Sequence, residues 1–415
     1  MKLSRARAPE IVIGLAAVLL IVFIFANHRL GHNVNSRFIT VERLISSGTL
    51  VHDDTPLTLS IDSVEVDGKR YSSKPLLYPL VLTVSALPLA AVLGTDVAKH
   101  QVGFMRWILL LNQALPWVFL LIVALRWVRE KTQDVWVQSV FVAGLSFAIL
   151  PYGYAATLNN HTPTAIWLFF AWWAVDRILT GGTEWPAAWA FAAGCFGGLA
   201  ASYELTSGIF FVLFALVLAR RNLGWGALVG VGATLGILPV FIGYWWISGE
   251  PVPFYLRPEL YDYDGSYWRN PQDMDALQDP RWLYVFNSTF GHRGFFAHSP
   301  YLLLGLAGIV AYVKRRDWLW SAVLTGSLIV MGYIWYKTDN YGGACISMRW
   351  FVQFSPLWAV AALPVLERAS VSQGRRVAVI AVILLSLATV WEALNTSAFG
   401  RGGWMHWLMR SLELI

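Results

Sequence analysis

Charged residues gather in the stretch from His28 to Leu80, which follows the first apolar segment of the chain. Its acidic residues are Asp53, Asp54, Asp62, Glu65 and Asp67, and its basic residues include Arg37, Lys69, Arg70 and Lys74. Carboxylates serve as general bases, and cations bind anionic groups. The stretch is therefore a candidate site for chemistry, although a solvated connecting loop would have the same composition.

Four cations from different polar segments have the chemistry of a phosphate site. Lys74 follows Tyr71 at the start of an apolar run, and Arg106 stands just before another such run. Arg293 and Arg349 come from two later polar segments. If these cations converge, they would stabilise the charge that a leaving phosphate gains as its bond to a sugar breaks. Each can equally be an interfacial side chain whose charged end reaches water.

Other polar clusters contain groups that bind a sugar or accept a proton. They are Asn159-Asn160-His161, the glycine-flanked pair His292 and Arg293, and the segment 337–349 with Asp339. His161 is the nearest to a tunable base, because histidine titrates near neutral pH. Glu204, in a tight turn between two apolar runs, is either part of a site or a charge at a helix N-terminus, and we favour the helix cap.

Composition and hydropathy predict an all-α polytopic membrane protein. The 415 residues are 57% hydrophobic and 13% charged, whereas soluble proteins carry roughly 25% charged residues. Long apolar runs without alternation predict helices rather than a barrel. We expect 11 spans, at about 9–27, 107–125, 135–150, 164–179, 187–203, 205–219, 225–248, 299–313, 317–335, 350–366 and 377–394.

A further apolar run, 75–94, decides the topology. Basic clusters mark cytoplasmic loops, and all of them fall on one side only if this run does not cross the membrane. We therefore predict an outer juxtamembrane or re-entrant helix, in keeping with its three prolines. The N-terminus is then cytoplasmic and the C-terminus outside. The net charge of +6 comes partly from short loops, so it indicates topology rather than nucleic-acid binding.

This topology predicts a single integral membrane domain, 1–415, with three outer parts. They are the first outer loop with its juxtamembrane helices, 28–106, a second large outer loop, 249–298, and an interfacial tail, 395–415. In the first loop, 36–47 has the spacing of a helix that ends at Gly48. Asp67-Gly68 then predicts the two-residue turn of a β-hairpin.

The first outer loop resembles that of the GT-C superfamily of integral membrane glycosyltransferases. The superfamily includes protein O-mannosyltransferases and the aminoarabinose transferases of lipid A. An Arg-Phe and Gly-Thr-Leu helix is followed by Asp-Gly-x-x-Tyr-Ser-x-Lys-Pro-Leu-Leu, 67–77. The family's loop typically ends Tyr-x-x-Lys-Pro-Pro-Leu, and Leu76 replaces the second proline. The Asn-Tyr-Gly-Gly…Arg-Trp segment, 340–350, and the Asn-Asn-His turn also resemble bacterial members.

The resemblance implies transfer of a sugar from a polyprenyl-phosphate donor to an acceptor, at the outer face of a bacterial inner membrane. Lys74 would contact the donor phosphate, with Arg106 nearby. The family has an acidic base soon after the first span, where this chain has Asn33 and Asn35. The expected catalytic residues are Asp54, Asp62 and His161, with Asp53 as a further acid. The expected substrate-binding residues are Tyr71, Lys74, Arg106, Asn159, Asn160, His292, Arg293, Asp339 and Arg349.

Two other functions fit the same sequence. A non-catalytic relative that binds or exports a lipid-linked sugar would keep the cations without a well-placed base. A solute transporter would need broken helices and polar groups at mid-membrane, where the later spans have few charges. The expected partners are a polyprenyl-phosphate-linked sugar, an acceptor of unknown kind and membrane lipid, but no nucleic acid. No cofactor is indicated, and a divalent metal stays open because several carboxylates lie on the outer side.

Overall fold

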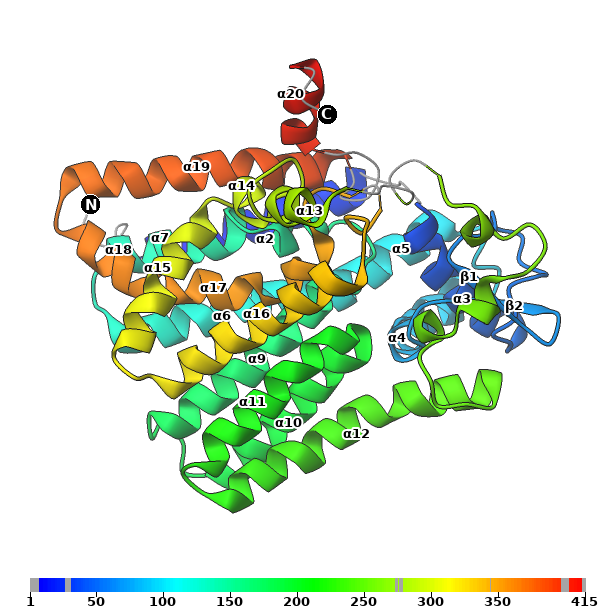
Figure 1. The fold of residues 1–415 in the computed structure, drawn as a ribbon, viewed down its shortest axis with the longest axis horizontal. Helices are drawn as coiled ribbons and strands as arrows, with labels where there is room; N and C mark the ends of the chain where they lie inside the picture. The colour runs from blue at the N-terminus through cyan, green and yellow to red at the C-terminus, as the bar shows by residue number, and fades with distance from the viewer. Residues whose placement is uncertain are drawn as a thin grey trace.

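Helices form most of the chain, and most of them run along a common direction (Figure 1). The computed structural model describes residues 7–26, 31–272, 275, 279–343, 345–396 and 403–412. The first loop, with α3, α4, β1 and β2, lies at one end of this bundle, at the right of Figure 1. The start of the first outer loop, 28–30, and parts of the expected interfacial tail lie outside the described residues.

The first half of the chain contains the hairpin and the helices up to α10. In chain order these elements are α2 (Ala8–Ala26), α3 (His32–Ser47), β1 (Ser63–Val66), β2 (Lys69–Ser72), α4 (Leu77–Leu93), α5 (Gln101–Leu109), η1 (Leu110–Ala114), α6 (Leu115–Lys131), α7 (Val135–Phe147), α8 (Leu150–Tyr154), α9 (His161–Leu179) and α10 (Pro186–Tyr203).

The second half is helical in all its described regular elements. They are η2 (Leu205–Ser207), α11 (Gly208–Ala219), α12 (Leu223–Ser248), η3 (Phe254–Leu256), η4 (Pro258–Tyr261), η5 (Tyr267–Arg269), α13 (Arg281–Thr289), α14 (Phe295–His298), α15 (Tyr301–Lys314), α16 (Trp318–Lys337), η7 (Arg349–Phe354), α17 (Ser355–Ala361), α18 (Leu363–Ser370), α19 (Gln373–Thr396) and α20 (Gly403–Ser411).

The expected all-α polytopic fold is confirmed. Among the described residues, six helices are long and apolar enough to cross a membrane: Ala8–Ala26, Gln101–Lys131, Leu223–Ser248, Trp318–Lys337, Arg349–Ser370 and Gln373–Asn395. Four shorter apolar helices accompany them, at Leu77–Leu93, Val135–Phe147, Leu205–Ala219 and Tyr301–Lys314. Each expected span is helical over most of its described residues, and 350–366 consists of most of η7, all of α17 and the first half of α18 rather than one uninterrupted α-helix.

The local structure expected in the first loop is confirmed. The helix α3 ends at Gly48, whose left-handed backbone (φ 67°, ψ 20°) lets its N–H bond the last turn. Asp67 and Gly68 form the turn of the antiparallel hairpin, in which Val64 pairs with Tyr71. The apolar run 75–94 contains α4, which lies beside α3 at the end of the bundle (Figure 1).

Small residues let α10 approach α12 closely. A Cβ added at Gly198 would lie 2.3 Å from the carbonyl oxygen of Ala233, and one at Gly194 would lie 2.1 Å from that of Val229. Such contacts leave no room for a side chain. Because α10 ends at Tyr203, this packing sets the position of the following turn at Glu204.

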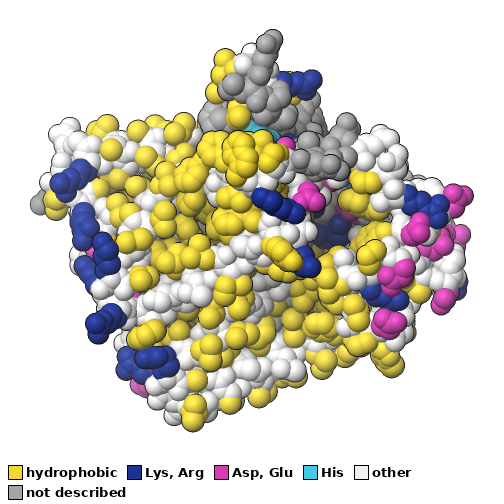
Figure 2. Space-filling model, in the orientation of Figure 1, with side chains coloured by type: hydrophobic (Ala, Val, Ile, Leu, Met, Phe, Trp, Pro, Cys, Tyr) yellow, Lys and Arg dark blue, Asp and Glu magenta, His cyan; other side chains and the backbone are white. Residues whose placement is uncertain are grey.

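Charge separates the two ends of the bundle. Figure 2 shows Lys and Arg side chains along the left edge of one face, hydrophobic side chains across its middle, and Asp and Glu together with further Lys and Arg at the right. The left end in Figure 1 holds α18 and the start of α19. The right end holds the first loop. Which end faces the cytoplasm stays a prediction from the basic clusters.

Candidate active site

A cavity of about 780 Å³ lies at the first-loop end of the bundle. Figure 2 shows this face hollowed between the apolar middle and the charged right end. The cavity is enclosed by α3, the segment before α4, the start of α9, the turn after α10, the 255–268 region, the end of α16 and the start of η7. Its ionisable residues are Arg37, Asp62, Lys74, His161, Glu204, Asp275, Lys337 and Arg349, together with Tyr203, Tyr255, Tyr261 and Tyr333.

Asp62 and Lys74 form an ion pair in this cavity. Lys74 Nζ lies 3.0 Å from Asp62 Oδ1, and their side chains are 17% and 12% exposed. Ser36 on α3 fixes the segment by donating to the Asp62 carbonyl at 2.6 Å. The Ser36 hydroxyl also lies 2.7 Å from the Ser72 hydroxyl. The hairpin therefore brings together an acid and a base that are 12 residues apart in sequence.

Arg37 is buried in α3, at the floor of the cavity. Its side chain donates to the Asn33 carbonyl at 2.8 Å and to Asn160 Oδ1 at 2.5 Å. Arg37 also donates to the side chain of Asn33. The expected position of the family's early acid is thus occupied by an amide that binds an arginine. Through Arg37, α3 is joined to the start of α9.

His161 and Glu204 form a second acid–base pair. His161 Nδ1 lies 3.2 Å from Glu204 Oε2, and the two side chains are 3% and 16% exposed. Asn160 Nδ2 donates to the same carboxylate oxygen at 2.8 Å and to the Tyr203 carbonyl at 2.9 Å. The α9 N-terminus and the turn after α10 are therefore held together by hydrogen bonds at the cavity wall.

The electrostatics of the cavity favour an anion. Burial opposes the charge of Asp62, but Lys74, Arg349 and Arg37 outweigh it and hold the pKa of that carboxyl below its ordinary value. Burial, with repulsion from Arg37 and Arg349, lowers the pKa of Lys74 despite the attraction of Asp62. Three cations thus act on one another, and an anionic ligand would relieve their repulsion.

Arg349 reaches this group from the far end of the sequence. It is the first residue of η7, and it acts on Arg37, Asp62, Lys74 and His161. Of the four cations expected to converge, Lys74 and Arg349 line the cavity. Arg37, which was expected among the charges of the first loop but not at the site, and Lys337 line the cavity as well.

Arg106 and Arg293 do not line the cavity. Arg106 donates to the Phe25 carbonyl at 2.7 Å, and its guanidinium lies 4.9 Å from the centre of the Phe25 ring. Arg293 is buried and donates to the Cys345 carbonyl. The neighbouring His292 is also buried, with its ring 5.2 Å from that of Tyr341. In this structure these three residues join segments of the protein to one another.

The other expected site residues divide between the cavity and its surroundings. Asn160 lines the cavity. Asn159 is buried behind it, donating to Gln113 at 2.9 Å and accepting from the Thr162 N–H at 2.8 Å. Tyr71 packs in the small apolar cluster around Val240. Asp54 and Asp339 are 85% and 61% exposed, and they face arginines outside the cavity.

Glu204 and Arg37 are the functional candidates that sequence reasoning missed. Glu204 was expected to cap a helix, yet its side chain makes no capping hydrogen bond to η2. In the sequence, Glu204 is a carboxylate between two apolar runs, and Arg37 is an arginine four residues after Asn33. Neither pattern indicates the contact with His161 or with Asn160 that the structure shows.

The described residues that line this cavity do not suit a divalent metal. No group of three or more His, Cys, Asp or Glu side chains comes together in the part of the chain that the structure describes. Asp62 faces Lys74, Glu204 faces His161, and Arg37 and Arg349 lie among them. Hard divalent cations prefer several oxygen ligands, and nearby cations would repel them.

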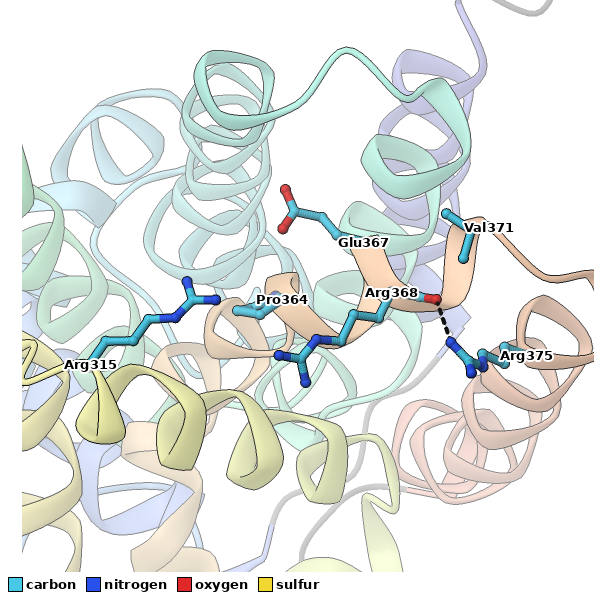
Figure 3. A pocket seen from close by; sticks show the side chains of 6 residues that line it. All are labelled: Arg315, Pro364, Glu367, Arg368, Val371 and Arg375. Atoms are coloured by element: carbon cyan, nitrogen blue, oxygen red, sulfur yellow. Dashed lines mark hydrogen bonds between the residues drawn. The ribbon is translucent and has the colours of Figure 1, made fainter.

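A smaller hollow lies at the opposite end of the bundle, where α18 meets α19 (Figure 3). It has a volume of about 350 Å³ and is lined by Arg315, Pro364, Glu367, Arg368, Val371 and Arg375. Arg375 donates to the Arg368 carbonyl at 3.2 Å. These charged side chains are exposed.

Comparison with known proteins supports the fold. No family model and no curated protein matches the sequence. Among solved structures, ArnT from Cupriavidus metallidurans, bound to undecaprenyl phosphate, is 16% identical with a TM-score of 0.59, covering 90% of this chain and 62% of that one. The oligosaccharyltransferase of Archaeoglobus fulgidus, in complex with Zn and sulfate, is 15% identical with a TM-score of 0.55, covering 94% and 53%.

A second structure of the archaeal enzyme, AglB in complex with an inhibitory peptide and a dolichol-phosphate, gives a TM-score of 0.52 at 15% identity. It covers 94% of this chain and 56% of that one. The chain therefore spans a little over half the length of the structures that it matches. At this identity the similarity shows the fold, and it confirms the GT-C-like architecture expected from the first loop.

Proposed function

We propose that this multi-pass membrane protein is a glycosyltransferase that takes a sugar from a polyprenyl-phosphate donor. The observation that carries the proposal is the convergence of Arg37, Lys74 and Arg349 at one cavity of a GT-C-like fold. We place the protein in a bacterial inner membrane, with its N-terminus in the cytoplasm and the cavity at the outer face.

The fold and the charges support a phosphate-bearing lipid as the donor. Two matched structures contain a polyprenyl phosphate: undecaprenyl phosphate in one and a dolichol-phosphate in the other. In this chain, the three cations lower the cost of bringing a phosphate into a partly buried site. They would also stabilise the phosphate more strongly as its bond to the sugar breaks and its charge grows.

The cavity also offers surfaces for a sugar or an acceptor. Tyr255, Tyr261 and Trp268 come from the second outer loop and form part of the wall. The Trp268 ring is fixed by a hydrogen bond of 2.9 Å from its Nε1 to the Ile61 carbonyl. This contact joins the second outer loop to the first, so both loops take part in shaping the cavity.

Binding of undecaprenyl phosphate to the purified protein in lipid nanodiscs tests the donor assignment. We expect Arg349→Gln to weaken binding by about tenfold or more, because a charged hydrogen bond contributes roughly 1.5–3 kcal/mol. Arg269→Gln is the matched control, since Arg269 pairs with Asp262 at 2.5 Å on the same side of the molecule and does not line the cavity. Equal affinity in wild type and Arg349→Gln would contradict the proposal.

A further inference from the structure

The carboxylate of Glu204 faces His161 at the start of α9 rather than the N–H groups of η2. Glu204 precedes η2, but it makes no capping hydrogen bond there. Its Oε2 instead accepts from Asn160 Nδ2 at 2.8 Å and lies 3.2 Å from His161 Nδ1. A buried carboxylate that bonds a histidine fixes the orientation of the ring and stabilises the imidazolium when it forms.

The direction of this contact defines the chemistry of His161. If Nδ1–H donates to Glu204, the lone pair of the neutral imidazole is on Nε2. His161 lines the same cavity as Lys74 and Arg349. In that tautomer the ring accepts a proton at Nε2, and it stands in the cavity that we assign to the donor phosphate.

The pair is connected to α3 through Arg37 and Asn160. Arg37 binds Asn33 and Asn160 together, and Asn160 in turn donates to Glu204. A chain of hydrogen bonds thus runs from α3 to the turn after α10. The amide of Asn33 stands at one end of this chain, and the carboxylate of Glu204 stands at the other end.

We propose that His161 is the general base of the transfer reaction and that Glu204 is the residue that positions it. This inference rests on the proposed glycosyltransferase function. The acceptor hydroxyl oxygen forms a bond to the anomeric carbon, and its proton passes to His161 Nε2. The bond from the anomeric carbon to the phosphate oxygen breaks, and its electron pair leaves with the polyprenyl phosphate. Glu204 stabilises the resulting imidazolium.

Asp62 is a weaker base for this step. Lys74 holds its carboxylate at 3.0 Å, and the surrounding cations keep its pKa below the ordinary value. A carboxylate with a lowered pKa has little affinity for a proton at neutral pH. We assign Asp62 to the positioning of Lys74.

The same geometry predicts a pH dependence. The charged groups that act on His161 are Glu204 from the turn after α10, Arg349 from η7 and Arg37 from α3. Burial, with repulsion from the two arginines, lowers the pKa of His161 below its ordinary value, against the attraction of Glu204. His161 is therefore neutral and able to accept a proton at neutral pH. The rate should fall as the pH drops through this lowered pKa and His161 becomes charged.

The test measures kcat against pH for release of undecaprenyl phosphate, using undecaprenyl-phosphate-linked sugars with membrane extract as the source of acceptor. We expect His161→Ala to lower kcat by about 10²-fold or more, to lose the acid limb of the profile, and to recover with added imidazole. Glu204→Gln should lower kcat by at least about tenfold and move the acid limb to lower pH, because the carboxylate no longer favours the imidazolium.

Controls separate this inference from the donor assignment. Affinity for undecaprenyl phosphate should stay within about threefold in both variants, which also shows that they fold. Glu250→Gln should match wild type, since Glu250 is exposed and pairs with Arg257 at 3.6 Å. If the wild type is active and both His161→Ala and Glu204→Gln keep its kcat and pH profile, the assignment of His161 as the base is wrong. The proposed glycosyltransferase function would then still stand. An inactive wild type that does not bind the lipid would overturn the proposed function as well.

Discussion

Single residues at this site act in pairs, and the pair of Asp62 and Lys74 shows what sequence reasoning missed. Lys74 stands at an apolar boundary, where an exposed interfacial lysine would contribute little to stability. The structure instead places it in an ion pair with side chains 17% and 12% exposed. The sequence shows that an acid and a lysine are present. It does not show that they are in contact, because the ion pair depends on the hairpin and on the hydrogen bonds of Ser36.

We expect Lys74→Ala to destabilise the protein by roughly 3 kcal/mol, because it leaves the Asp62 carboxylate buried without its partner. The double variant Lys74→Met with Asp62→Leu should recover most of this loss, since it removes both charges. Thermal unfolding in detergent measures both effects. Equal stability of Lys74→Ala and wild type would show that the ion pair does not form.

At the scale of elements, apolar periodicity predicted the helices well, and turn chemistry predicted the first loop. The expected helix at 36–47, the hairpin turn at Asp67-Gly68 and the helix within 75–94 are all present. The pairing of helices was not predictable from the sequence. The glycines of α10 and α12 are compatible with close helix packing, but they do not indicate which helix is the partner. Hydrogen bonds from Asn160 to Tyr203 and Glu204 hold Glu204 opposite His161, and they too were not predictable from the sequence.

The packing of α10 against α12 is therefore expected to be a condition for activity. Gly198→Val should destabilise the protein by roughly 1–3 kcal/mol, because the new side chain meets the α12 backbone. Transferase activity of Gly198→Val should also fall, because the turn at Glu204 would move. Gly230→Val is the matched control on α12, since no other atom lies within 4 Å of a Cβ added there. Thermal unfolding and release of undecaprenyl phosphate compare the two variants.

At the scale of the whole molecule, the chain has two chemically different ends. Basic side chains mark one end, and the other holds the first loop, the cavity and most of the acidic side chains (Figure 2). The clusters of Lys and Arg in the sequence predicted which segments face the cytoplasm, and that orientation stays a prediction. The sequence did not predict which outer residues meet, because the cavity joins residues as far apart in sequence as Arg37 and Arg349.

The most direct test of the account is turnover by the wild-type protein in proteoliposomes. The purified chain would be supplied with a panel of undecaprenyl-phosphate-linked sugars and membrane extract, and free undecaprenyl phosphate would be measured over time. We predict release with at least one donor, and its loss in a variant that removes Arg37, Lys74 and Arg349 together. Tight binding without release would point to a non-catalytic carrier protein, and neither binding nor release would contradict the glycosyltransferase assignment.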